Sequence, residues 1–189
     1  MATKKSQRMF IWVIAIVMTV GTVAGFVAMM LAPQNQKIDQ QQQEKAYADY
    51  QKQMEEQAAA HAASSKPLDG YTAEAFDKAG ATELKVETLK QGEGEVLKAD
   101  SSVNVNYFGW TSDGKIFDST NQNGTTTPTD ISLSGVIKGW TQGLTGVKVG
   151  STVKLTIPAA LGYAEAGSPP NIGPNEPLQF IIEIKELKK

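Results

Sequence analysis

Cysteine is absent from this chain of 189 residues, and histidine occurs once, as His61. The lack of cysteine excludes disulfides, a thiol nucleophile and thiolate metal sites. A single histidine in a polar tract cannot form a multi-histidine metal site, and it does not supply a histidine triad to a folded domain. Acid-base chemistry would therefore fall to carboxylates or tyrosines.

Arginine is also scarce. After residue 66 the chain has 11 lysines, 15 acidic residues and no arginine. Guanidinium groups are the side chains best suited to phosphate and guanine, so this composition argues against nucleic acid as a partner. About 41% of all residues are hydrophobic, which is enough for one modest core, and we expect one folded domain with appendages.

Residues 9–32 form the one long hydrophobic run, 24 residues without a charge. At about 1.5 Å per residue, a helix of that length crosses a hydrocarbon core of about 30 Å. We expect an uncleaved transmembrane signal-anchor helix, with cleavage near its end as the alternative. Three basic residues lie within residues 1–8 and only Lys37 follows the run closely, which predicts a cytoplasmic N-terminus and an extracytoplasmic C-terminal domain. We therefore expect a single-pass protein of the cell membrane that contacts lipid through residues 9–32.

Residues 33–79 are predicted to be a polar, partly helical linker. The tract is rich in Gln, Ala, Lys and Glu, which favour helix but offer little to bury. Tyr47, Tyr50, Met54 and His61 follow one another at spacings of 3, 4 and 7, a faint heptad pattern. A short coiled coil is therefore the alternative to a solvated spacer, and the sequence leaves the oligomeric state open.

From about residue 84 the hydrophobic pattern changes to a period of two. Turn residues at 112–115 and 148–151 suit hairpins, so the sheet should be mainly antiparallel. Only residues 136–144 predict a helix, which is short and weakened by two glycines. The alternation predicts half-buried strands at 83–89, 103–110, 115–119, 130–134, 152–157 and 178–187.

A loop of about twenty residues, 159–177, separates the last two predicted strands. It is rich in Gly and Pro, yet it carries Tyr163 and Ile172. Loops of this length inside a compact domain are usually functional or disordered, and the apolar residues in this one favour a binding flap.

Three runs of the sequence together resemble the FKBP-type peptidyl-prolyl cis-trans isomerases. They are VNVNYFGW…GKIFDST, LSGVIKGWTQGL and IPAALGYAEAGSPPNIGPNEPLQFIIEIKEL. Their order and spacing also match the family, with ten residues from Tyr107 to Phe117 and seventeen from Tyr163 to Phe180. The resemblance covers residues 80–189, which we therefore take as the isomerase domain.

The resemblance implies an α+β fold, in which a curled antiparallel sheet of five or six strands surrounds one short helix. It also implies an apolar pocket between helix and sheet, with Trp140 as its floor and Asp118 at its wall, close to Tyr163. Asp118 and Tyr163 are the catalytic candidates. The substrate-binding candidates are Tyr107, Phe117, Val136, Ile137, Trp140, Ile172 and Phe180.

The function that the resemblance implies is acceleration of cis-trans rotation about the bond before proline, which assists the folding of exported proteins. The barrier of about 18 to 20 kcal/mol arises from amide conjugation, and no bond has to break. An apolar pocket that grips the proline ring suffices, so we expect no metal, nucleophile or cofactor. Proline-containing polypeptides are the expected partners, and the resemblance adds macrolide inhibitors. The alternative is a non-catalytic chaperone or adaptor that holds such segments in the same groove.

Taken singly, the site residues have ordinary explanations. Asp118 before Ser119 and Thr120 suits a turn or a cap, and Trp140 and Phe180 suit a core. Only their joint spacing favours the pocket. The chain also departs from the family pattern, because Thr129 and Ile131 replace two aromatic residues, while many relatives have larger or apolar residues at Ser168 and Asn171. These departures concern substrate preference and macrolide affinity.

Overall fold

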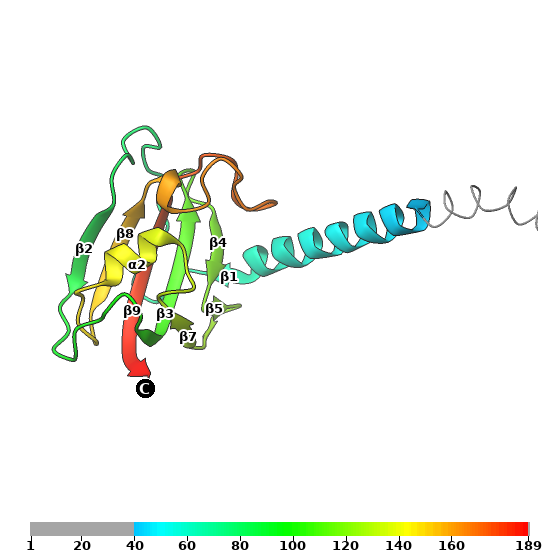
Figure 1. Ribbon diagram of the computed structural model, residues 1–189. Coiled ribbons are helices and arrows are strands. Elements are labelled where there is room, and N and C mark those ends of the chain that lie inside the picture. Colours follow the sequence, from blue (N-terminus) through cyan, green and yellow to red (C-terminus); the bar gives the residue numbers. More distant parts are fainter. Residues whose placement is uncertain (1–39, 189) are drawn as a thin grey trace, which may run out of the picture. The chain divides into compact units, whose positions relative to one another are not determined.

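The computed structural model describes residues 40–188 (Figure 1). The chain divides into two compact units, Met1–Gln53 and Met54–Lys189, and each is described by itself. Within residues 40–188, no helix combines the length and the apolar character needed to cross a membrane. The predicted span at 9–32 and the N-terminal segment 1–8 lie outside the described residues.

Residues 40–64 are helical, as the abundance of Gln, Ala, Lys and Glu predicts. In the first unit the helical residues are exposed, and Tyr47 is 67% exposed. Residues 54–64 belong to the second unit, where Ala62 is buried. The end of this helix is therefore part of the folded domain.

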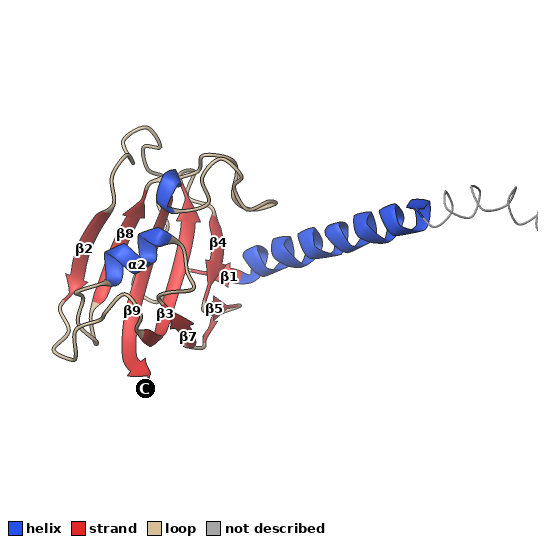
Figure 2. Cartoon of the chain, in the orientation of Figure 1, coloured by secondary structure: helices blue, strands red, loops and turns tan. Residues whose placement is uncertain are grey.

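The second unit is built on two antiparallel sheets (Figure 2). The larger sheet has the order β2-β8-β9-β3-β4, and β7 pairs with β3 beyond this path. The smaller sheet has the order β1-β5-β6. The strands are β1 (Ser65–Lys66), β2 (Lys85–Lys90), β3 (Ser102–Thr111), β4 (Ile116–Ser119), β5 (Asn121–Gln122), β6 (Thr125–Thr126), β7 (Thr129–Ser132), β8 (Thr152–Ile157) and β9 (Leu178–Lys188).

The six segments with period-two alternation all become strands of the larger sheet. The longest pairing joins β3 and β9, from Ser102 opposite Lys188 to Thr111 opposite Leu178. The turn at 112–115 closes the hairpin of β3 and β4 as predicted, whereas the turn at 148–151 leads into β8 from the helix before it. The predicted α+β fold with an antiparallel sheet around a short helix is confirmed.

That short helix is α2 (Lys138–Leu144), which crosses one face of the larger sheet (Figure 1). Its glycines have a packing role. A Cβ on Gly139 would lie 2.3 Å from Cγ2 of Ile157 on β8, a distance that real Cβ atoms do not adopt. Glycine at this position lowers the helix propensity, but only a residue without a side chain lets α2 lie this close to the sheet.

The main core fills the space between α2 and the sheet. It includes the fully buried side chains of Val103, Leu133, Leu144 and Leu155. Burial of aliphatic side chains of this size stabilises the fold by about 1.5 to 3 kcal/mol each. Because Trp140 and Phe180 belong to the same cluster, the core and the aromatic surface above it are built together.

A second cluster covers the opposite face of the sheet. Phe108, Trp110 and Ile181 lie at its centre, and Leu68 and Phe76 pack against them. Both packing residues come from the tract predicted as linker. Compact structure therefore begins well before residue 80, because residues 67–76 supply apolar side chains that the outer face of the sheet requires.

Candidate active site

Four aromatic rings meet where α2 approaches the centre of the larger sheet. The indole of Trp140 contacts Tyr107 edge-on, with ring centroids 5.2 Å apart, and it contacts Phe180 in the same way at 5.3 Å. Phe117 completes the group against Phe180 at 5.6 Å. Perpendicular pairs of this kind are favoured by the ring quadrupoles and hold each ring in place. Trp140, only 4% exposed, is therefore a rigid floor.

Above this floor lies a cavity of about 450 Å³. This volume is in the range of small-ligand sites. Its lining combines the aromatic group with residues before α2 and one residue of the long loop: Tyr107, Phe117, Asp118, Ile131, Gly135, Val136, Ile137, Trp140, Tyr163 and Phe180.

Most of the residues predicted from the sequence meet at this cavity, from Tyr107 on β3 to Phe180 on β9. Ile172 is the exception. It is buried in the main core and lines a neighbouring groove rather than the cavity. Ile131 and Gly135 line the cavity but were not predicted as site residues. Ile131 had a usable signal, because it occupies an aromatic position of the family pattern.

Asp118 is held at the cavity wall by Tyr107. The Tyr107 hydroxyl donates to Oδ2 of Asp118 over 2.6 Å. Burial raises the pKa of Tyr107 far above its ordinary value, and the nearby Asp118 carboxylate and Tyr163 add to the effect. Burial also raises the pKa of Tyr163, with Asp118 as the second cause. Both phenols are therefore protonated donors at neutral pH.

The local backbone explains how Asp118 reaches this place. Asp118 pairs with Gly109 across the β3–β4 hairpin, beside an irregularity in register. A Cβ on Gly109 would lie 2.4 Å from Cε1 of Phe180 and 2.7 Å from Cζ of Phe117. The missing side chain at Gly109 thus leaves room for both rings and lets the carboxylate lie beside them.

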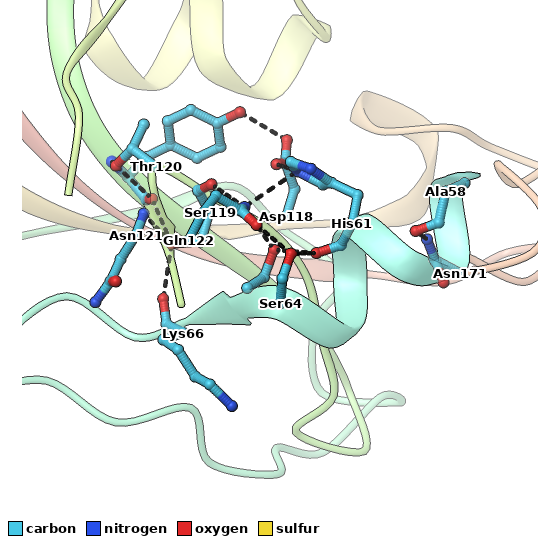
Figure 3. A network of polar contacts seen from close by, with 12 residues as sticks. Ala58, His61, Ser64, Lys66, Asp118, Ser119, Thr120, Asn121, Gln122 and Asn171 are labelled. Carbon is cyan, nitrogen blue, oxygen red and sulfur yellow. Dashed lines mark hydrogen bonds and ion pairs between the residues drawn. The ribbon is translucent and has the colours of Figure 1, made fainter. Parts of the chain in front are cut away.

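His61 also reaches Asp118, which the sequence did not suggest (Figure 3). Its Nε2 lies 2.8 Å from Oδ1 of Asp118, although the two residues are 57 positions apart. The polar composition around His61 predicts that this residue belongs to the solvated spacer. The structure corrects this interpretation, because the helix end that carries His61 belongs to the folded unit. A lone histidine in a polar tract gives no sequence signal for such a contact.

Metal ligands do not gather in the part of the chain that the structure describes. Within residues 40–188, no three side chains of His, Cys, Asp or Glu lie close enough together to hold a metal ion. The cavity lining itself offers an apolar surface with one carboxylate, Asp118, and two phenols, Tyr107 and Tyr163.

Comparisons with known proteins agree with this site. A sequence model of the FKBP-type peptidyl-prolyl cis-trans isomerases matches residues 93–185. FKBP-type peptidyl-prolyl cis-trans isomerase FkpA of Escherichia coli K12 is 39% identical over 139 residues, which are 73% of this chain and 50% of FkpA. Peptidyl-prolyl cis-trans isomerase Mip of Coxiella burnetii is 38% identical over 109 residues, 58% of this chain and 46% of Mip.

A crystal structure of a peptidyl-prolyl cis-trans isomerase from Pseudomonas syringae superimposes with a TM-score of 0.52 at 30% identity, and the match covers 71% of this chain and 93% of that one. The chain belongs to the family of FKBP-type peptidyl-prolyl cis-trans isomerases. It spans about half the length of the curated relatives FkpA and Mip.

Proposed function

We propose that this protein catalyses cis-trans isomerisation of the bond before proline in polypeptide substrates. The observation that carries the proposal is the apolar cavity with Trp140 as its floor, where Asp118 and Tyr163 provide the polar edge. Its aromatic and aliphatic lining suits a compact apolar ring such as proline.

The proposed mechanism needs no covalent step. The planar amide is more dipolar than the twisted one, so exclusion of water raises the free energy of the ground state more than that of the transition state. Each 1.4 kcal/mol removed from the barrier accelerates rotation about tenfold. The apolar walls would supply this effect while Trp140, Val136 and Phe180 hold the ring.

Polar groups at the cavity would hold the substrate backbone during rotation. The Tyr163 hydroxyl is a protonated donor, and the N–H of Ile137 precedes α2 at a position where helices leave N–H groups without partners. We assign both as donors to substrate carbonyl groups. Asp118, fixed by Tyr107, would shape the local field rather than transfer a proton. Ile172 would act from the core, by supporting the loop.

The experiment is a proline-peptide isomerisation assay with the full-length chain. Acceleration over buffer that is lost in Trp140→Leu supports the proposal. The alternative is an adaptor that binds proline-containing segments without accelerating their isomerisation. Peptide binding by calorimetry without any acceleration would favour the adaptor and contradict catalysis.

Macrolide binding is part of the proposal, because the cavity that takes proline would also take such ligands. Ile131 lines the cavity where the family pattern has an aromatic residue, so its wall is thinner there. We expect weaker macrolide inhibition than in relatives with phenylalanine, and Ile131→Phe should strengthen it. An unchanged inhibition constant in this variant would contradict the role of Ile131.

We further propose that residues 9–32 anchor the protein in the cell membrane, with residues 1–8 in the cytoplasm and the isomerase domain outside. The support is the sequence, with its uncharged run and the basic residues before it. Protease treatment of cells stripped of any outer layer, with the cytoplasmic membrane first intact and then broken, tests the orientation. Digestion of the domain only after the cytoplasmic membrane is broken would contradict it, and mass spectrometry of the mature chain would reveal cleavage.

A further inference from the structure

The end of the helix at residues 54–64 is tied to the strands that carry Asp118. Hydroxyls of Ser64 and Ser65 each donate to the carbonyl oxygen of His61 over 2.9 Å, and Ser65 is buried. Immediately after the helix, β1 pairs with β5, which follows β4 by one residue. The helix end that carries His61 is thus joined, through β1, to strand β5, and β5 directly follows the strand that carries Asp118.

Three further hydrogen bonds join this segment to the domain. Asn171 Nδ2 donates to the carbonyl oxygen of Ala58 over 3.0 Å, and the backbone N–H of Asn123 donates to the carbonyl oxygen of Ser64 over 2.9 Å. The hydroxyl of Ser119, next to Asp118, donates to the carbonyl oxygen of Lys66 over 2.7 Å (Figure 3). Contacts on both sides of His61 therefore fix its Cα relative to the site.

The hydrogen-bond network also fixes which atom of His61 carries a proton. The side-chain nitrogen of Gln122 lies 3.3 Å from Nε2 of His61, but its two hydrogens are taken by the carbonyl oxygen of Ser119 at 2.7 Å and the hydroxyl of Ser65 at 3.0 Å. Nε2 of His61 is therefore the donor, and Oδ1 of Asp118 accepts.

We propose that His61 is a positioning residue of the isomerase site, and this role rests on the function proposed above. Asp118 receives one hydrogen bond on each oxygen, from Tyr107 on β3 and from His61 on the helix. Its side chain is 35% exposed, so with one donor removed the carboxylate can turn toward water. Two donors from different elements keep it at the cavity wall.

The test compares His61→Phe, which has no donor, with His61→Gln, whose amide can donate in the same place. In the full-length chain, His61→Phe should lower kcat about threefold to tenfold with little change in KM. This corresponds to about 0.65 to 1.4 kcal/mol, the net contribution of one ordinary hydrogen bond. His61→Gln should recover at least half of the loss. Equal impairment of both variants, or wild-type activity of His61→Phe, would overturn the role.

A spectroscopic measurement tests the contact without relying on catalysis. His61 is the only histidine, so its imidazole signals in an NMR spectrum need no assignment. Asp118→Asn should shift these signals, while Asp130→Asn, an exposed carboxylate on β7, should leave them unchanged. Unshifted signals in Asp118→Asn would overturn the contact. A wild-type chain without activity that still shows the shift would contradict the proposed function and the positioning role, but not the contact.

A different observation carries a second inference. A groove of about 510 Å³ lies between the helix end and the long loop, and it shares Phe117, Asp118 and Tyr163 with the proline cavity. Met54 and Ala58 line it on the helix side, and on the loop side its lining includes Pro169 and Ile172. The lining also includes the uncharged Gln57, Ser168 and Asn171. Its one carboxylate, Asp118, pairs with His61, so the groove suits a chain without net charge.

We infer that this groove binds the residues of the substrate that flank the isomerised proline. The groove and the cavity share three side chains, so they are continuous. With a proline in the cavity, the next residues of an extended substrate chain would lie in the groove. The helix end would then act as an outer wall of the substrate site, and its occupant would be a segment of the same polypeptide.

The test measures dissociation constants by calorimetry for one proline peptide of four residues and for versions lengthened by four leucines or alanines at either end. Lengthening at one end should tighten binding at least fivefold in the wild-type chain. Ala58→Phe, which fills the groove, should abolish this gain, whereas Ala60→Phe, exposed on the same helix, should keep it. No gain in the wild type, or the same gain in both variants, would overturn the inference. Because binding is measured, the result is independent of turnover.

Discussion

The hydroxyl of Tyr107 on β3 donates a 2.6 Å hydrogen bond to the carboxylate of Asp118 on β4, at the cavity wall. Tyr107→Phe removes this donor and keeps the ring contact with Trp140. We expect lower kcat/KM and a loss of about 1 to 3 kcal/mol in the free energy of unfolding, the usual cost of a lost hydrogen bond to a charged group.

The raised pKa of Tyr107 adds a pH test to this variant. Because the pKa is raised, deprotonation occurs above the ordinary tyrosine value of about 10, and the hydroxyl donates throughout the range from about pH 7 to 9. The ratio of wild-type to Tyr107→Phe rates should therefore stay constant across that range in the peptide assay. A ratio that falls toward one by pH 9 would show that the phenol titrates there.

Trp140→Leu should weaken substrate binding, because it removes the floor of the cavity. The indole is 4% exposed and packs against two other rings, so we also expect a loss of stability of about 2 to 4 kcal/mol. Trp110→Leu is the matched control, since Trp110 is equally buried but lies on the opposite face of the sheet. Similar loss of affinity in both variants would mean that destabilisation, not the floor, explains the result.

Tyr163→Phe should slow turnover while the fold stays intact. Tyr163 is 38% exposed in the loop, so the loss of its hydroxyl changes the packing little. The unfolding midpoint should therefore stay within the error of measurement. Tyr71→Phe, on the opposite face of the sheet, should leave the rate unchanged. If Tyr163→Phe turns over like the wild type, its hydroxyl has no part in the reaction.

Gly109→Ala should damage the site through its rings. The new Cβ would lie within 2.7 Å of Phe180 and Phe117, and both must move, so we expect a loss of about 1 to 3 kcal/mol in stability and weaker substrate binding. Gly173→Ala is the control, because nothing lies within 4 Å of its Cβ position. Equal affinity in the two variants would show that the close approach at Gly109 is not needed.

Glu176 predicts a pH dependence of stability. Its carboxylate accepts hydrogen bonds from Lys78 at 2.6 Å and from the N–H and hydroxyl of Ser112 at 2.8 and 2.6 Å. Burial acts to raise the pKa of Glu176, but these hydrogen bonds outweigh burial and the pKa is lowered. A lowered folded-state pKa means that the stabilisation is present above about pH 4.5 and is lost as the pH falls through the folded-state value.

Glu176→Gln should therefore cost about 1 to 2 kcal/mol in urea unfolding at pH 7. The difference from wild type should shrink at about pH 3, where the wild-type carboxyl takes up a proton. Glu165→Gln, an exposed position in the same loop, should change little at either pH. A cost that is independent of pH would contradict the role of the charge.

Much of the fold was predictable because it depends on local pattern. The alternation in residues 103–110 and 178–187 predicts two half-buried strands, and they form the central pair β3 and β9. The glycines of residues 136–144 made the helix prediction weak, since propensity alone does not show that Gly139 must approach Ile157. The tract at 67–76 was missed because its few apolar residues lack a period, although the outer face of the sheet buries them.

The candidate site divides in the same way. Family spacing predicted Trp140, Phe180 and Asp118, which meet at one cavity. Ile172 was predicted in the cavity, but the loop turns it into the core and the neighbouring groove. The loop sequence does not say which way such a side chain faces.

By itself, the sequence determined the strand pattern, the family and the set of aromatic and acidic residues, because alternation and motif spacing are properties of neighbouring residues. Only the tertiary structure decided that the helix end belongs to the domain and that His61 meets Asp118 over 2.8 Å. Contacts between residues 57 positions apart depend on chain folding in three dimensions, and no local pattern encodes them.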